Sequence, residues 1–193
     1  GGVMTNYTIK VLDVQNNVRF EKTDAVELAA VFDGEYQKGD KIQLSSSSDK
    51  VYTIVKLDDC MDFSFTLLSG VFTIEIPFDE KKMSYNPKAF TGTRHYLYAR
   101  EALPAEISCR KNLALNVWDC HENTALFPHT SANVETRGES VFAARNAIDG
   151  CIANTSHGNW PFASWGINRD PQAQLKIDFG RNVKIDELVF YLR

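Results

Sequence analysis

A loop near the end of the chain carries the side chains best suited to ligand chemistry. It holds His157, Asn159 and Trp160, with Trp165 a few residues further on, and Arg137 stands in a preceding loop. An aromatic ring can stack on the apolar face of a sugar, while imidazole, amide and guanidinium groups bond its hydroxyls. We therefore predict a carbohydrate-binding site whose first residues are Trp160 and His157, with Asn159 and Arg137 next to them.

Catalytic alternatives have weaker support. Glu135, Glu139 and Asp149 are the carboxylates available for glycoside hydrolysis, which needs two acids flanking one bond, but their spacing does not show that two converge. The run at residues 138–142 lacks the last glycine of a serine nucleophile elbow. A zinc site is disfavoured by irregular spacing of its four candidates, Cys109, Cys120, His121 and His129.

Strands and a turn must position this loop. Ala147 to Gly150 ends in an Asp-Gly pair, which tolerates the backbone angles of a tight turn. Leu175 to Phe179 alternates apolar and polar residues and stops at Gly180, a pattern typical of a strand buried on one face. Ile185 to Leu192 predicts a second such strand, so the loop lies between a turn and two strands.

The first hundred residues predict an all-β domain. Short alternating runs are separated by turn residues, which favours a β-sandwich. The predicted strands are Tyr7–Val14, Val26–Phe32, Lys41–Leu44, Val51–Leu57, Phe63–Leu68, Val71–Phe78 and His95–Arg100. After them, residues 102–126 form a connecting segment in which residues 112–119 suit either a strand or a helical turn, and residues 141–146 suggest a short helix or 3₁₀ turn.

The later region resembles a known family. The ordered set Ala147 to Gly150, Ser164-Trp165, Leu175 to Gly180 and the following strand is similar to the discoidin or coagulation-factor C-type family of galactose-binding-like jelly rolls. The segment Phe127 to Arg145 also resembles a signature of bacterial proteins described as carbohydrate-binding. This resemblance implies a jelly-roll sandwich, a non-catalytic carbohydrate-binding role, and a tryptophan at Trp165 that packs into the core.

The same resemblance implies a structural calcium ion near the Asp-Gly turn. Asp149 matches the expected position, and Asn154 with backbone carbonyls offers further hard oxygen ligands. The alternative is that the Asp149 carboxylate only caps its own turn. No cofactor is otherwise required.

A weak internal repeat indicates two copies of one plan. Residues 31–34 correspond to 147–150, residues 55–58 to 175–178, and residues 62–68 to 186–192. We therefore expect two jelly-roll-like sandwiches: residues 1–101, which are a divergent galactose-binding-like copy, and residues 127–193. The second lacks later strands, so we expect a chain cut at Arg193 and an incomplete sandwich that favours self-association. Unpaired edges and an uncovered core face are strongly disfavoured.

Composition limits the partners. A net charge of −4, with 21 basic and 25 acidic residues, gives no basic surface for nucleic acid. The most apolar window, residues 63–78, is interrupted by polar residues and falls short of the ~20 apolar residues of a membrane-spanning helix. The four widely spaced cysteines indicate free thiols, and with no signal peptide in view they favour a cytoplasmic location without excluding an extracellular one. A glycan is the predicted partner, and a protein-interaction or scaffold module is the first alternative, ahead of a glycoside hydrolase.

Overall fold

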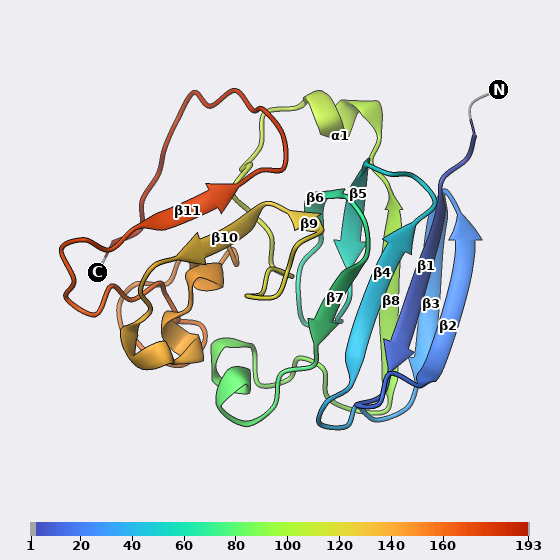
Figure 1. The fold of residues 1–193 in the computed structure, drawn as a ribbon, viewed down its shortest axis with the longest axis horizontal. Helices are drawn as coiled ribbons and strands as arrows, with labels where there is room; N and C mark the ends of the chain where they lie inside the picture. The colour runs from blue at the N-terminus through green and yellow to red at the C-terminus, as the bar shows by residue number, and fades with distance from the viewer. Residues whose placement is uncertain (1–2, 193) are drawn as a thin grey trace.

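The protein is mostly β in the computed structural model, which describes residues 3–192 (Figure 1). Three antiparallel sheets are formed by the described residues: a four-stranded sheet in the order β2-β1-β4-β7, a five-stranded sheet in the order β3-β8-β5-β6-β9, and a two-stranded sheet of β10 and β11. The strands are β1 (Asn6–Leu12), β2 (Val18–Ala25), β3 (Glu27–Asp33), β4 (Lys41–Ser46), β5 (Val51–Lys56), β6 (Ser64–Leu68), β7 (Phe72–Glu75), β8 (Arg94–Glu101), β9 (Leu126–Phe127), β10 (His129–Ala132) and β11 (Leu175–Asp178). All seven strands predicted in the first hundred residues are confirmed.

One hydrophobic core joins the two larger sheets. Figure 1 shows them lying face to face, with β1, β4 and β7 in front of β8, β5 and β6. The alternation in β1 and β3 directs every second side chain inward, because successive residues of a strand point to opposite faces. The buried cluster draws on both sheets and includes Tyr7, Ile9, Leu28, Ile42, Leu44, Val55, Phe72 and Leu97.

The segment 102–126 packs into this core. It begins with the short helix α1 (Pro104–Ser108) and then runs without regular structure to β9, which pairs with β6. Trp118 is fully buried, and its indole Nε1–H donates to the Val55 carbonyl at 3.1 Å. Residues 112–119 form no strand and no helix, and contain one hydrogen-bonded turn, which the Asp119 N–H closes by donating to the Asn116 carbonyl at 3.2 Å.

Buried polar contacts hold the end of this segment. The Asp119 carboxylate accepts hydrogen bonds from His129 Nδ1 at 2.7 Å, from Asn123 Nδ2 at 2.7 Å, and from the backbone and hydroxyl of Thr130 at 2.8 and 2.7 Å. The guanidinium of Arg145 is also buried and donates to the Asp119 carbonyl at 2.9 Å. These contacts tie β10 and the turns after it to the core of the larger sheets.

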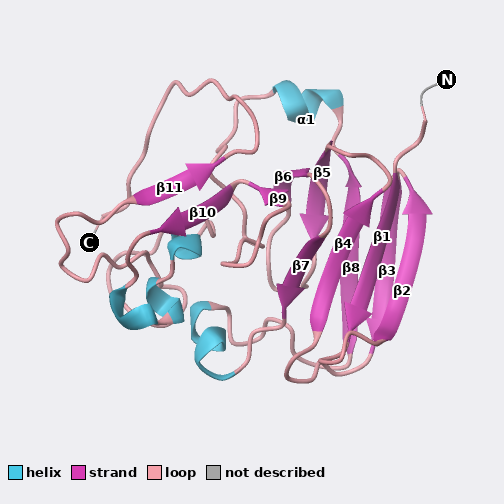
Figure 2. Cartoon of the chain, in the orientation of Figure 1, coloured by secondary structure: helices cyan, strands magenta, loops and turns pink. Residues whose placement is uncertain are grey.

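The last part of the chain has less regular structure than the sequence predicts. Short 3₁₀ turns, η2 (Thr136–Gly138), η3 (Ser140–Phe142) and η4 (Ala144–Ala147), lie below β10, next to η1 (Asp79–Ser84) (Figure 2). The turns η3 and η4 confirm the short helix or 3₁₀ turn expected at residues 141–146. The strand predicted at Leu175 to Phe179 is confirmed as β11, which pairs with β10.

The strand predicted at Ile185 to Leu192 is wrong. Residues 182–192 carry no strand, and Leu188, Phe190 and Leu192 are 70 to 78% exposed. A strand exists only by pairing, and the described residues supply no backbone partner here. The repeat is accordingly not matched block by block: residues 64–68 form β6, while the matching residues 188–192 form no strand. Arg193, expected to mark a cleavage point, lies outside the described residues.

Candidate functional site

Two chain segments run side by side to form the floor of the candidate site. The Thr136 N–H donates to the Gly166 carbonyl at 2.9 Å, Gly166 N–H to the Phe142 carbonyl at 3.0 Å, and Ser164 N–H to the Val141 carbonyl at 2.9 Å. A Cβ at Gly166 would lie 2.5 Å from Thr136 Oγ1 and 2.9 Å from Phe142 Cβ, so only glycine allows this approach. The close contact places the residues on either side of Gly166 against the 3₁₀ turns.

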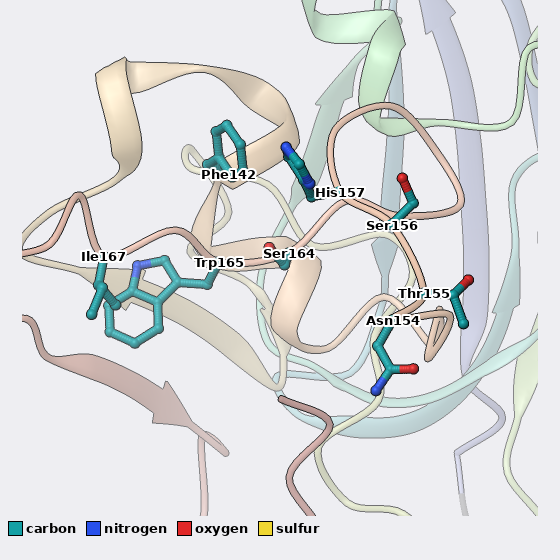
Figure 3. A pocket seen from close by; sticks show the side chains of 8 residues that line it. All are labelled: Phe142, Asn154, Thr155, Ser156, His157, Ser164, Trp165 and Ile167. Carbon is teal, nitrogen blue, oxygen red and sulfur yellow. The ribbon is translucent and has the colours of Figure 1, made fainter. Parts of the chain in front are cut away.

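The first hollow lies over this floor. It has a volume of about 530 Å³ and is open to solvent. Figure 3 shows its lining, with the ring of Phe142 next to the His157 imidazole, Trp165 near Ile167, and a loop of small polar residues. That lining is Phe142, Asn154, Thr155, Ser156, His157, Ser164, Trp165 and Ile167. An aromatic wall faces hydroxyl and amide groups, which is the combination that binds a sugar ring.

A second hollow of about 530 Å³ adjoins the first, because Phe142 and His157 line both. Its other walls come from η1 and from the loop around η2, and its complete lining is Glu80, Met83, Arg137, Glu139, Val141, Phe142, His157, Gly158 and Asn159. The Ser140 N–H donates to Glu80 Oε1 at 2.6 Å and the Ser140 hydroxyl to the Glu80 carbonyl at 2.7 Å. These two bonds fix η3 against η1 and define the shape of the hollow.

Two charged side chains at the second hollow, Arg137 and Glu139, form an ion pair. Arg137 Nε and Nη2 donate to the two oxygens of Glu139 at 2.5 and 3.0 Å, and the guanidinium carbon lies 5.4 Å from the centroid of the Phe142 ring. Arg137 adopts φ 52°, in the left-handed region, which non-glycine residues seldom occupy. The hydrogen bonds from Arg137 lower the pKa of the Glu139 carboxyl. The pair therefore offers a fixed, ionised carboxylate and guanidinium at the rim.

The structure brings three of the four predicted ligand residues together. His157, Asn159 and Arg137 line the second hollow, and His157 lines the first as well. Trp160, placed first in the sequence prediction, lines neither. Its backbone N–H donates to the Met83 carbonyl at 2.8 Å, so the residue anchors the loop instead.

Trp165 takes the place expected of Trp160. It is half-buried and lines the first hollow, although the family resemblance implies a core position. Its Nε1–H donates to the Val134 carbonyl at 2.8 Å, which fixes the ring. Sequence reasoning also missed Phe142, because an apolar residue in a short turn looks like core. The signal that could have found it is Gly166, whose close packing brings Phe142 beside the loop.

Asp149 and Asn154, the residues predicted to bind calcium, differ in burial and in their hydrogen-bond partners. Asp149 is buried, 8% exposed, and its Oδ1 accepts from the Cys151 N–H at 2.8 Å, which is the turn-capping alternative. Gly150 follows at φ 84°, as the predicted turn requires. Asn154 is exposed and its Nδ2 donates to the Leu192 carbonyl at 3.0 Å. Within residues 3–192, no group of three or more His, Cys, Asp or Glu side chains is placed to hold a metal ion.

The three candidate catalytic carboxylates have separate partners. Glu135 Oε1 lies 2.5 Å from His121 Nε2, and its Oε2 accepts from the Ala144 N–H at 2.7 Å. Glu139 is paired with Arg137 at the second hollow. Asp149 is buried, and this burial raises its pKa to about 6 even though the nearby Arg145 charge acts in the opposite direction. Of these three carboxylates, Glu139 alone lines either hollow.

Comparisons with family models, curated proteins and solved structures give no match for this chain.

Four cysteines, Cys60, Cys109, Cys120 and Cys151, are free. No helix in the described part of the chain has the length and apolar character needed to cross a membrane.

Proposed function

We propose that this protein is a non-catalytic carbohydrate-binding protein, and that the two adjoining hollows are its glycan site. The observation that carries the proposal is the shared wall of Phe142 and His157, with the indole of Trp165 on one side and the polar groups of Arg137 and Asn159 on the other. A glycan of two or more sugars would place one ring in each hollow.

Each side of the wall has a separate role in this proposal. In the first hollow the Trp165 ring removes the apolar face of a sugar from water, while the hydroxyls and amide of residues 154–156 bond its rim. In the second hollow the Glu139 carboxylate accepts from sugar hydroxyls and the Asn159 amide both donates and accepts. Because the Arg137–Glu139 pair is already formed, little ordering is needed on binding.

Two assignments of fold accompany this proposal of function. We propose that the four- and five-stranded sheets form a jelly-roll-like β-sandwich, and that residues 127–193 belong to a galactose-binding-like sandwich. The shared core of the two larger sheets supports the first assignment. The Asp149-Gly150 turn and the strand β11 lie at two of the motifs that carry the resemblance, Ala147 to Gly150 and Leu175 to Gly180, which supports the second assignment. A structural calcium ion at Asp149 stays part of this proposal.

The experiment is a glycan-array screen followed by titration of each hit, using tryptophan fluorescence. Two of the three tryptophans, Trp160 and Trp165, lie at or beside the site, so binding there is expected to change the emission. His157→Ala is the main variant, because His157 is exposed and its removal leaves the floor intact. We expect affinity to fall about ten-fold, the equivalent of about 1.4 kcal/mol and of one lost hydrogen bond.

His121→Ala is the matched control. His121 is also an exposed histidine, and it lies outside both hollows, so its removal should leave affinity unchanged. Trp165→Phe keeps an aromatic ring but removes the indole, and should weaken binding less than Trp165→Ala. Failure of every glycan to bind, or equal affinity in wild type and His157→Ala, would contradict the assignment of the site.

A protein-interaction or scaffold role is the second candidate, and one observation favours it. Residues 185–192 form a run of exposed apolar side chains, Ile185, Leu188, Val189, Phe190, Tyr191 and Leu192, between 53 and 78% exposed. An exposed apolar run of this length is typical of a surface that another chain covers. Self-association through this run stays a proposal alongside glycan binding.

A further inference from the structure

The outer face of the five-stranded sheet carries an aromatic patch remote in sequence from the two hollows. In β8 the side chains of His95, Leu97 and Ala99 are buried in the core. Alternation therefore places Tyr96 and Tyr98 on the opposite, outer face. Residues of neighbouring strands extend this face on both sides.

The register of the strands determines which residues lie opposite Tyr96 and Tyr98. Val31 of β3 lies opposite Tyr96, and Lys56 of β5 lies opposite Tyr98. The ring centroids of Tyr96 and Tyr98 are 6.1 Å apart, and those of Tyr98 and Phe63 are 5.6 Å apart. Val31, Phe63 and Tyr96 are 50, 48 and 39% exposed. We call Val31, Phe63, Tyr96 and Tyr98 the aromatic face.

Later segments of the chain contact one end of the outer sheet surface. Tyr52 and Phe65 stack on each other, with ring centroids 5.4 Å apart. The Arg181 guanidinium lies 5.1 Å from the centroid of the Tyr52 ring, and the Lys111 ammonium lies 4.6 Å from that of Phe65. Segments from later in the chain thus contact the end of this surface at Tyr52 and Phe65, while the contacts of Arg181 and Lys111 do not extend to the aromatic face.

Polar groups surround the aromatic face. The Lys56 ammonium lies 5.0 Å from the centroid of the Phe63 ring. The Tyr98 hydroxyl donates to the Glu27 carboxylate. Asp33 and Arg94, at the next outward positions after Val31 and Tyr96, form an exposed ion pair at 2.8 Å. Carboxylate, ammonium and guanidinium groups therefore ring the aromatic side chains, within reach of a ligand lying on them.

We propose that the aromatic face is a second glycan site, which binds an extended polysaccharide lying along the sheet. A chain of sugars presents successive apolar ring faces, and neighbouring aromatic side chains can each contact one of them, while the charged rim bonds the hydroxyls. The inference shares its ligand class with the proposed function but none of its residues.

Size favours a glycan over a protein partner. A stable protein interface buries about 800 Å² on each partner. A large aromatic residue buries about 150–250 Å² when fully covered. Only three side chains of the aromatic face are more than a third exposed, each by half or less. The open apolar area is therefore well short of a stable dimer interface, but it suits one or two sugar rings.

The test separates this face from the hollows. All three tryptophans, Trp118, Trp160 and Trp165, lie outside the aromatic face, so fluorescence reports on the hollows, while retardation in gels containing polysaccharide reports on all binding. The probes are soluble β-glucan, xylan, galactan and mannan. The variants are Tyr96→Ala combined with Phe63→Ala, and Tyr96→Phe, which keeps the ring. Val18→Ala, an exposed valine on the other large sheet, is the matched control.

The expected result is a retardation constant at least ten-fold weaker for one or more polysaccharides in the double alanine variant, with Tyr96→Phe and Val18→Ala close to wild type. The fluorescence titration with the array hit should stay unchanged, which keeps this result independent of the hollows. Equal retardation of wild type and the double variant by every probe, or no retardation of wild type by any, would overturn the inference. A concentration-dependent dimer in sedimentation velocity that the double variant abolishes would also overturn it, in favour of a second copy.

Discussion

The buried Asp149 carboxyl is predicted to make the protein less stable as pH rises. Its side chain is buried beside Arg145 and Cys151, and burial raises its pKa from 3.8 to about 6. Below pH 3.8 the group is protonated in both folded and unfolded chains. Between about pH 4 and pH 6 the unfolded chain loses the proton first, so the folded state loses stability through this range and the deficit is complete above about pH 6.

The size of the effect follows from the two pKa values. Each pKa unit is worth about 1.4 kcal/mol, so the step from 3.8 to about 6 corresponds to about 3 kcal/mol. An asparagine side chain at this position cannot ionise, but its amide oxygen can still accept from the Cys151 N–H. Asp149→Asn should therefore be close to wild type at pH 4 and more stable than wild type by about 3 kcal/mol at pH 8.

Urea unfolding at pH 4 and pH 8 measures the difference. Asp49→Asn, which changes an exposed aspartate, is the control and should show the same difference from wild type at both pH values. Repeating the series with calcium tests the proposed ion, because a cation bound to the Asp149 carboxylate would stabilise wild type at pH 8 and leave Asp149→Asn unaffected. The reasoning is refuted if Asp149→Asn in chelator is no more stable than wild type at pH 8.

Two further substitutions test the contacts that tie residues 102–132 to the core. Trp118→Phe should lower the free energy of unfolding by roughly 2–4 kcal/mol, because it opens a cavity and leaves the buried Val55 carbonyl without its donor; a urea midpoint equal to that of wild type would contradict this. The hydrogen bond to Asp119 raises the pKa of His129, so its stabilising contribution is fully present below about pH 6.5 and is lost as pH rises through the raised value. His129→Gln should therefore lose more stability at pH 5.5 than at pH 9, and an equal loss at both would show that the imidazolium has no part in it.

The strands of the larger sheets could be predicted because burial is one-sided there. In β1, β3, β5 and β8, inward residues are mostly apolar, with Thr53 and His95 as exceptions, and outward residues are mostly polar or aromatic, so the period of two is visible in the sequence. The exceptions are the two-residue β9 and β2, which sequence analysis missed. The strand β2 is an edge strand whose side chains are nearly all exposed, so burial imposes no alternation on it.

For the candidate site, sequence analysis predicted three of the residues that line the hollows, but not how they are brought together. His157, Asn159 and Arg137 come together because Ser140 and Gly166 fix the turns next to their loop. These contacts join residues far apart in sequence, and no local pattern encodes them. Another long-range contact decides between the two tryptophans of this region. The Met83 carbonyl accepts a hydrogen bond from the Trp160 backbone N–H, and Trp165 is the tryptophan that lines the hollow.

The sequence prediction made two errors with one cause: it missed the strand β2, and it placed a strand at residues 185–192 where none forms. The stretch at β2 lacks alternation but forms a strand, because β1 offers it a row of backbone groups from Asn6 to Leu12. Residues 185–192 have the composition of a strand but remain unpaired, and the ion pairs that hold this stretch, from Asp186 and Glu187 to Arg110, are exposed. Exposed pairs of this kind are screened by solvent and contribute too little to order a strand alone. Strand formation here is therefore decided by whether a partner edge is present, and a second chain that supplied one would be expected to turn residues 185–192 into a strand.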